Sequence, residues 1–203
     1  MKIICVGRNY AAHAKELNNA VEEEPVIFLK PDTALLTNNQ DFYLPDFSND
    51  IHYETELVVK ICKAGKHIDE QFANRYYDAI SVGIDFTARD LQSVLKSKGL
   101  PWERAKAFDH SAVIGRFLPL AEAGSVNDLT FSMKLNGQKV QEGHTNEMVF
   151  SVDKVIAFVS RFITLKTGDL IYTGTPQGVG PVKAGDRLEG FLGDQELFNF
   201  SIK

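Results

Sequence analysis

Hydrophobic and polar residues alternate along the segment 51–61. This period of two is typical of a half-buried β-strand, in which successive side chains point to opposite faces. The polar face carries His52, Glu54 and Glu56. The Cα atoms of the two glutamates are then about 6 to 7 Å apart, so their charges repel unless water or a cation lies between them. The opposite face is apolar or β-branched and consists of Ile51, Tyr53, Thr55, Leu57, Val59 and Ile61.

Other patterns predict further strands and a few short helices. Apolar residues recur at helical spacing after Ser151, which predicts a core-packing helix over 152–163 with Ser151 as its N-cap. An Asn-Gly pair between two extended runs predicts a type I′ hairpin over 133–140. Strands are also expected at 170–173 and, as a closing hairpin, over 186–202. At 203 residues, these elements predict one domain, residues 1–203, with mixed α and β structure dominated by strands.

A third candidate carboxylate follows the strand pattern about thirty residues on. An apolar run ends in Asp85, just before a predicted helix over about 88–98. Thr87 and Asp90 resemble a capping box at the start of that helix. Asp85 is therefore expected at the rim of a sheet rather than in its core.

Glu54, Glu56 and Asp85 are candidate ligands of one metal ion. Oxygen ligands without a Cys or His ligand pattern suit a hard divalent cation, Mg²⁺ or Mn²⁺. Ca²⁺ accepts the same ligand type, but the sequence has no loop of the EF-hand kind. His52 is expected to support the ligands through a hydrogen bond rather than to bind the metal. The alternative is a solvated strand face, on which water screens the two glutamates.

Composition narrows the classes of protein. A net charge of −5 with dispersed Lys and Arg residues argues against a nucleic-acid partner. No apolar run approaches the ~18 residues of a membrane span, and the apolar stretch 1–6 is too short for a signal peptide. Cys5 and Cys62 lack metal or redox spacing and are interpreted as reduced core residues. We therefore expect a cytoplasmic protein that binds neither nucleic acid nor membranes.

Seven motifs together resemble the fumarylacetoacetate hydrolase family. They occur in order with compatible spacing, and the resemblance runs from residue 3 to about residue 190. Within the family, the chain is most similar to the short single-domain members that act on acylpyruvates and oxaloacetate. The motifs are GRNYAAH at 7–13, FLKP at 28–31, HYETEL at 52–57, DFTARDLQ at 85–92, GLPW at 99–102, AKAFD at 105–109 and TGTPQGVGP at 173–181.

The resemblance implies an α+β, β-dominated fold, a mixed β-roll or sandwich with short helices that assembles as a homodimer. It also implies that the three carboxylates hold Mg²⁺ or Mn²⁺ at the open end of the roll. His13 and Glu16 resemble the family's catalytic His-Glu pair. They are three residues apart in a short helix that Asn9 can cap, so they share a face on which Glu16 raises the basicity of His13. The segment of about 9–21 would be a mobile lid, since it carries small and polar residues.

Further residues are assigned roles by the same resemblance. Lys106 matches the catalytic lysine that the family places against the substrate's oxo or carboxylate oxygens. Four residues match substrate-binding positions or can reach the substrate: Arg8, Arg89, Gln92 and Thr175. Arg8 could instead anchor the lid, and Arg89 could instead bridge to Asp90 or to a metal carboxylate. No role is predicted for Lys30.

The implied function is hydrolysis of the C–C bond of an acylpyruvate to pyruvate and a carboxylate, through an enolate stabilised by the metal. The same enolate permits decarboxylation of oxaloacetate. Proton transfer alone would give an oxaloacetate tautomerase or a 2-hydroxy-dienoate isomerase. A protein of a different class, a non-catalytic binder of dicarboxylates that depends on the metal, would need only the three carboxylates.

Overall fold

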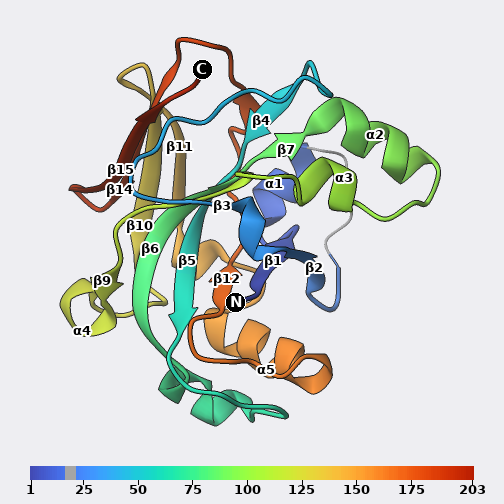
Figure 1. Cartoon of the computed structure of the whole chain (residues 1–203). Helices are drawn as coiled ribbons and strands as arrows, with labels where there is room; N and C mark the ends of the chain where they lie inside the picture. The colour runs from blue at the N-terminus through green and yellow to red at the C-terminus, as the bar shows by residue number, and fades with distance from the viewer. Residues whose placement is uncertain (17–21) are drawn as a thin grey trace.

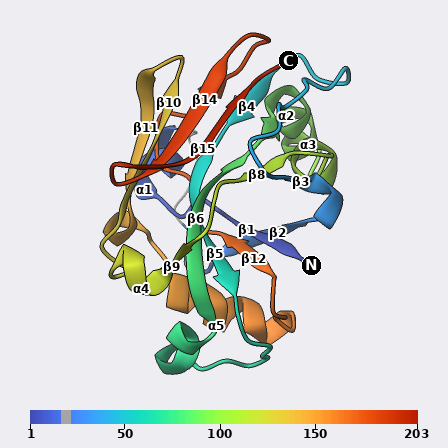
Figure 2. The ribbon, with the colours of Figure 1, turned by 60° about the vertical axis from the view of Figure 1, so that its left-hand side comes forward.

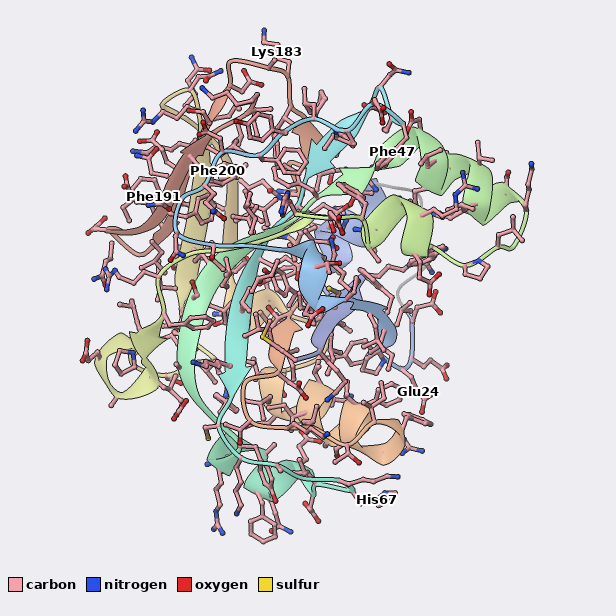
Figure 3. All side chains as sticks on the ribbon, in the orientation of Figure 1. Glu24, Phe47, His67, Lys183, Phe191 and Phe200 are labelled. Atoms are coloured by element: carbon pink, nitrogen blue, oxygen red, sulfur yellow. The ribbon has the colours of Figure 1, made fainter. Side chains whose placement is uncertain are left out.

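Three β-sheets and a few short helices build the molecule, described here by a computed structural model for residues 1–16 and 22–203. Figure 1 shows long strands running the length of the molecule, with α5 below them and α2 and α3 on one side. Turning the molecule brings the β10–β11 and β14–β15 hairpins into view as a second layer (Figure 2). Lys183 and His67 lie at opposite ends of this elongated body (Figure 3). No helix in the described part of the chain is long and apolar enough to cross a membrane.

The strands fall into three sheets. The eight-stranded sheet contains β1 (Ile3–Gly7), β2 (Val26–Lys30), β3 (Leu35–Leu36), β5 (Thr55–Ile61), β6 (Tyr77–Asp85), β8 (Ala112–Ile114), β9 (Leu118–Pro119) and β12 (Leu170–Tyr172). The four-stranded sheet contains β10 (Thr130–Leu135), β11 (Gln138–His144), β14 (Arg187–Leu192) and β15 (Gln195–Ser201). The three-stranded sheet contains β4 (Ile51–Tyr53), β7 (Thr87–Ala88) and β13 (Gly180–Pro181).

The helices are short and lie between these strands. The α-helices are α1 (Ala11–Glu16), α2 (Arg89–Ser97), α3 (Glu103–Lys106), α4 (Leu120–Ala123) and α5 (Val152–Phe162). The 3-10 helices are η1 (Asp32–Ala34), η2 (Glu70–Arg75) and η3 (Thr145–Glu147). This strand-dominated α+β architecture is the predicted one.

The central strands β5 and β6 pair antiparallel, and β12 pairs with the other edge of β5. The prediction of one continuous, half-buried strand over 51–61 was wrong in two respects. The strand is interrupted at Glu54, so that β4 and β5 belong to different sheets, and every residue of β5 except Lys60 is buried. The face expected to meet solvent is covered by a small second core in which Val58 packs with Cys5 and Tyr172.

Three local predictions are confirmed. Asn136 and Gly137 have φ of 53° and 79° between β10 and β11, as a type I′ turn requires. The hydroxyl of Ser151 accepts a hydrogen bond from the backbone N–H of Lys154 at 3.2 Å and caps α5. Strands β14 and β15 pair as the expected closing hairpin.

Two predicted helix caps are absent because their side chains have other partners. Ala88 is the N-cap of α2, and the carboxylate of Asp90 accepts hydrogen bonds from the Ser48 hydroxyl and the Asn49 backbone instead. Asn9 does not cap α1. Its side chain bonds the backbone of Phe150 and the carbonyl of Thr173, and so holds the start of α1 to two distant segments.

Candidate active site

The three predicted metal ligands meet where the start of β5 lies beside the end of β6. One carboxylate oxygen from each of Glu54, Glu56 and Asp85 lies within 4.8 Å of the other two. The residues are only 6%, 2% and 1% exposed. The solvated-face alternative is therefore wrong, since water cannot screen charges buried this deeply. The donor set contains only oxygen atoms, which fits a hard divalent cation.

Positively charged side chains surround the triad formed by Glu54, Glu56 and Asp85. Lys106 Nζ donates to Glu54 Oε2 and to Asp85 Oδ2, both at 2.7 Å. Arg89 donates to Glu54 Oε1 at 2.5 Å. Lys106 also lies 5.3 Å from the ring centre of Phe28, whose face favours a cation. The contact of Lys106 with substrate stays a prediction.

Lys30 is one of the residues near the triad for which the sequence predicted no role. Its side chain is fully buried, and Nζ lies 2.6 Å from Asp85 Oδ1. Nζ also donates to the carbonyl and the hydroxyl of Ser111 at 2.8 and 3.0 Å. A lysine at the end of an apolar strand and just before a proline was the available signal, because a buried ammonium needs a charged partner.

The two glutamates differ in electrostatic environment. Burial raises the pKa of Glu54, but the positive charges of Lys106 and Arg89, aided by His13, outweigh burial and hold it well below the usual range. Burial and the negative charge of Asp85 raise the pKa of Glu56 well above that range. Glu56 therefore gains more than Glu54 from a cation placed among the three carboxylates.

The glycine loop after β12 completes the environment of Glu56. The backbone N–H of Gly174 donates to Glu56 Oε2 at 2.7 Å. Gly174 has φ of 102°, and a Cβ atom there would lie 2.7 Å from the Cβ of Asn9. Only glycine fits this close approach of the loop to the start of α1.

The predicted His-Glu pair forms on α1. His13 Nδ1 lies 3.0 Å from Glu16 Oε2, and Glu16 Oε1 accepts a hydrogen bond from the backbone of Gly178 at 3.1 Å. A carboxylate beside Nδ1 favours the tautomer with its proton there, which leaves Nε2 as the basic atom. His13 is 5% exposed and lines the same cavity as the triad.

The expected lid segment lies partly outside the described residues, which omit 17–21. In the described part, Tyr10 and Ala14 are buried, and the ring of Tyr10 contacts Phe131 edge-on with centroids 6.4 Å apart. The expectation that this segment offers little apolar surface was therefore wrong at Tyr10. Its mobility without ligand stays a prediction.

Two predicted residues on α2 are joined to each other and to the triad. Arg89 donates to Gln92 Oε1 at 2.7 Å as well as to Glu54. The bridge from Arg89 to a metal carboxylate, one of its two alternatives, is thus present, whereas its substrate contact stays a prediction. His52 does not support the triad as expected, because the strand break turns it away and its Nε2 pairs with Asp50 at 2.9 Å.

The hydroxyl of Thr175 is oriented by Gln141, a residue for which no role was predicted. The Oε1 atom of Gln141 accepts from the backbone of Thr55 at 2.9 Å, which fixes the orientation of the amide. Its Nε2 then donates to Thr175 Oγ1 at 2.9 Å and to the carbonyl of Pro176 at 3.0 Å. Because the hydroxyl oxygen already accepts a hydrogen bond, the hydroxyl proton remains available to an acceptor in the cavity. Gln141 lies on β11, far along the chain from all seven family motifs.

The triad, His13, Lys106 and the predicted substrate-binding residues face one small cavity of about 50 Å³. It brings together every predicted site residue except Glu16, which lies behind His13. Arg8 lines the cavity and pairs with the carboxylate of Glu22. Lys96, Phe28 and Trp102 also line it and were not predicted as site residues.

A strand-dominated α+β fold with a buried carboxylate triad and a His-Glu pair over one cavity defines an acid-base site built to hold a cation. The sequence profile described as "Fumarylacetoacetate (FAA) hydrolase C-terminal" matches residues 2–199. The chain therefore belongs to the fumarylacetoacetate hydrolase family.

Individual relatives carry several activities. The chain is 42% identical over 201 residues to the mitochondrial oxaloacetate tautomerase FAHD1 of Mus musculus, covering 99% of this chain and 91% of that protein. It is 44% identical over 203 residues to the mitochondrial oxaloacetate decarboxylase of Dictyostelium discoideum, covering 99% and 93%. The crystal structure of fumarylpyruvate hydrolase from Pseudomonas aeruginosa, in complex with Mn²⁺ and pyruvate, superposes with a TM-score of 0.94 at 38% identity, covering 100% and 89%.

Proposed function

We propose that this protein is an enzyme that depends on a divalent cation and interconverts the keto and enol forms of oxaloacetate. The observation that carries the proposal is the position of His13, which is paired with Glu16 and lines the same small cavity as the carboxylate triad. A base beside a site for a 2-oxo acid is what proton transfer at C3 requires.

Glu54, Glu56 and Asp85 would hold the cation, Mg²⁺ or Mn²⁺. When bound, it supplies Lewis acidity that stabilises negative charge on the oxygens of a 2-oxo acid. The relative from Pseudomonas aeruginosa with Mn²⁺ and pyruvate supports both the class of metal and the class of ligand.

His13 takes the proton from C3 of the keto form through Nε2, with Glu16 orienting the ring and stabilising the positive charge that develops on it. The electron pair of the broken C–H bond forms the C2–C3 double bond, and the C2 carbonyl electrons move to its oxygen. Solvent then supplies a proton to that oxygen and gives the enol, and protonated His13 returns its proton to solvent, so the net change is the transfer of one proton from C3 to the oxygen on C2. Burial lowers the pKa of Lys106, but the charges of Asp85 and Glu54 outweigh it and raise the pKa, so the ammonium stays charged and stabilises the developing negative charge.

The size of the cavity favours a small 2-oxo acid. Pockets for drug-sized ligands measure roughly 300 to 1,000 Å³, whereas this one measures about 50 Å³. Oxaloacetate and acetylpyruvate are nearly equal in size, so the size does not choose between tautomerisation and hydrolysis. The oxaloacetate tautomerase of Mus musculus supports tautomerisation.

Hydrolysis of the C–C bond of acylpyruvates, the function implied by the sequence, is the second candidate. A histidine oriented by Glu16 can also activate water, and the fumarylpyruvate hydrolase relative supports this reaction. Decarboxylation of oxaloacetate needs no water and is supported by the relative from Dictyostelium discoideum.

One set of assays separates these outcomes. Enol decay, pyruvate and CO₂ are measured with oxaloacetate, and pyruvate and acetate with acetylpyruvate, each with Mg²⁺, Mn²⁺ or a chelator. We expect rapid keto-enol exchange of oxaloacetate that the chelator abolishes. Release of pyruvate and acetate from acetylpyruvate without faster exchange of oxaloacetate would favour the hydrolase. If neither substrate turned over, the protein would be a binder rather than an enzyme.

We also propose that the protein acts as a cytoplasmic homodimer without a nucleic-acid partner. Strand β2 is at an edge of the eight-stranded sheet, and Leu29 on it is 42% exposed, which supports pairing with a second copy. Cys5 and Cys62 are free thiols, which supports a reducing compartment. Light scattering after size-exclusion chromatography tests the dimer.

A further inference from the structure

Two aromatic side chains lie between the active-site cavity and a second, larger groove. Phe28 and Trp102 line the cavity of about 50 Å³ that the triad lines. The same two residues line a groove of about 450 Å³. Both side chains are half-buried, and their rings meet edge-on with centroids 6.0 Å apart. Phe28 and Trp102 therefore form a partition between the two spaces, the aromatic partition.

The two sides of the aromatic partition differ in chemistry. On the cavity side, the described lining residues are charged or polar apart from Val6, Gly7 and the partition itself. On the groove side, they are apolar except for Glu103. The apolar ones besides the partition are Val26, Ile27, Leu29, Leu100, Pro101 and Ile163. A hydrocarbon chain that passed from the cavity into the groove would therefore gain from burial against apolar surface.

The aromatic partition is close to the triad. Lys106 Nζ lies 2.7 Å from two oxygens of the triad and 5.3 Å from the ring centre of Phe28. The backbone carbonyl of Trp102 accepts hydrogen bonds from the N–H groups of Ala105 and Lys106 at 2.8 and 3.0 Å. One helical turn thus holds Trp102 near Lys106. A substituent that extends from the triad past Lys106 meets the aromatic partition.

The cavity alone has no room for a long substituent. Its volume of about 50 Å³ corresponds to about four water molecules. Shortening Trp102 would join this cavity to the groove, which is several times larger. It would also leave in place the ring of Phe28, which lies against the Lys106 ammonium. Trp102 is therefore the side chain that sets the limit on substrate length.

We propose that Trp102 restricts the site to small 2-oxo acids, and that the groove behind it accepts the aliphatic tail of a longer 2-oxo acid once the indole is removed. The inference rests on the proposed function, in which the 2-oxo acid end of the substrate binds at the triad. It makes Trp102 a specificity-determining residue and gives the groove one occupant, an unbranched hydrocarbon chain.

Pyruvate and 2-oxooctanoate form a matched pair of ligands, because they share the 2-oxo acid end and differ in the length of the aliphatic chain. Binding of each to the wild-type protein, Trp102→Leu and Trp102→Ala is measured by calorimetry with Mg²⁺ present. The readout is the ratio of the two affinities within each protein, so a change at the triad that affects both ligands cancels. Burial of one methylene strengthens binding about four-fold. Trp102→Ala should therefore shift the ratio toward 2-oxooctanoate by at least about 10-fold, and Trp102→Leu should shift it by less.

Leu100 tests where the tail binds. It lines the groove but not the cavity, and it is 47% exposed. Leu100→Asp in the Trp102→Ala background places a charge in the groove and should return the ratio to its wild-type value, because a charge disfavours an apolar neighbour. Val94→Asp in the same background is the matched control, since Val94 is 49% exposed and lines neither space. It should leave the shift intact.

The outcomes separate this inference from the proposed function. An unchanged ratio in Trp102→Ala, with pyruvate still bound, would overturn the inference and leave the proposed function standing. A shift that Leu100→Asp did not remove would also overturn it, because the tail would then bind elsewhere. Light scattering is measured on the same proteins, and a change of oligomeric state in Trp102→Ala would assign the groove to a second copy of the chain instead. If the wild-type protein did not bind pyruvate with Mg²⁺, the proposed function would fail and the inference with it.

Discussion

The triad and His13 line one cavity, but the triad and the His13–Glu16 pair are held in different ways. Glu56 and Asp85 lie on the paired strands β5 and β6, and Glu54 directly precedes β5. The oxygens of the triad contact Lys30, Lys106 and Arg89. The pair sits on α1, a helix of six residues, and Glu16 accepts a hydrogen bond from the backbone N–H of Gly178.

This difference separates the binding of metal and substrate from the transfer of the proton. The charges that would receive a metal and a 2-oxo acid are fixed by the sheet before any ligand binds, whereas the group that would transfer the proton depends on the position of a small helix. Changes near the triad should therefore alter stability and metal affinity. Changes on α1 should alter turnover and little else.

The largest effect is expected from His13→Ala. Loss of a general base should lower the rate of keto-enol exchange by about 10²-fold to 10⁴-fold, with metal affinity and stability unchanged. Initial rates at saturating Mg²⁺ and calorimetric titration of the metal provide the two measurements. Lys15→Ala, an exposed change on the same helix, is the control. A rate equal to that of the control would remove His13 from the reaction.

Lys30→Met tests the expectation that changes near the triad alter stability. Removing one partner from a buried ion pair leaves Asp85 without that charge and should cost about 3 to 5 kcal/mol of unfolding free energy, measured by urea denaturation. Lys183→Met changes an exposed lysine at one end of the molecule and should cost almost nothing. Equal stability of the two variants would show that the triad does not depend on Lys30.

Glu54→Gln and Asp85→Asn should each weaken the binding of Mg²⁺ or Mn²⁺ by at least about 10-fold, because each removes a charged oxygen ligand. Asp50→Asn is the matched control, since Asp50 bonds His52 near the triad but is not part of it. Calorimetry that gave all three variants the wild-type affinity would place the metal elsewhere.

The smallest effect is expected from Gln141→Leu, which leaves the Thr175 hydroxyl without its orienting donor. One hydrogen bond contributes about 1 kcal/mol, so KM for oxaloacetate should rise about 5-fold while the metal affinity stays the same. Thr175→Val should have little further effect in the Gln141→Leu background, which a double-mutant cycle measures. Fully additive effects would mean that Gln141 does not act through Thr175.

Local patterns were enough to find the ligands and several elements. A period of two placed Glu54 and Glu56 on one face, helical spacing placed His13 beside Glu16, and Asn136-Gly137 fixed a turn. These features depend on residues close in sequence, whose relative directions follow from the geometry of a strand, helix or turn.

Contacts between distant segments determined burial and hydrogen-bond partners, which the local patterns could not predict. Burial of the triad required the small core around Val58, Cys5 and Tyr172, and the partners of Asn9 and Asp90 are more than forty residues away or on another element. No local pattern reveals such partners, because a polar side chain takes whichever donor or acceptor the fold brings within reach.

The sequence by itself determined the family, the strand-dominated fold, the three carboxylates and the His-Glu pair. Only the tertiary structure assigned Lys30 to Asp85 and Gln141 to Thr175. The physical reason is electrostatic. A charge or a polar group buried by folding must find its partner in space, and the chain separation of these pairs, 55 and 34 residues, leaves no trace in a local pattern.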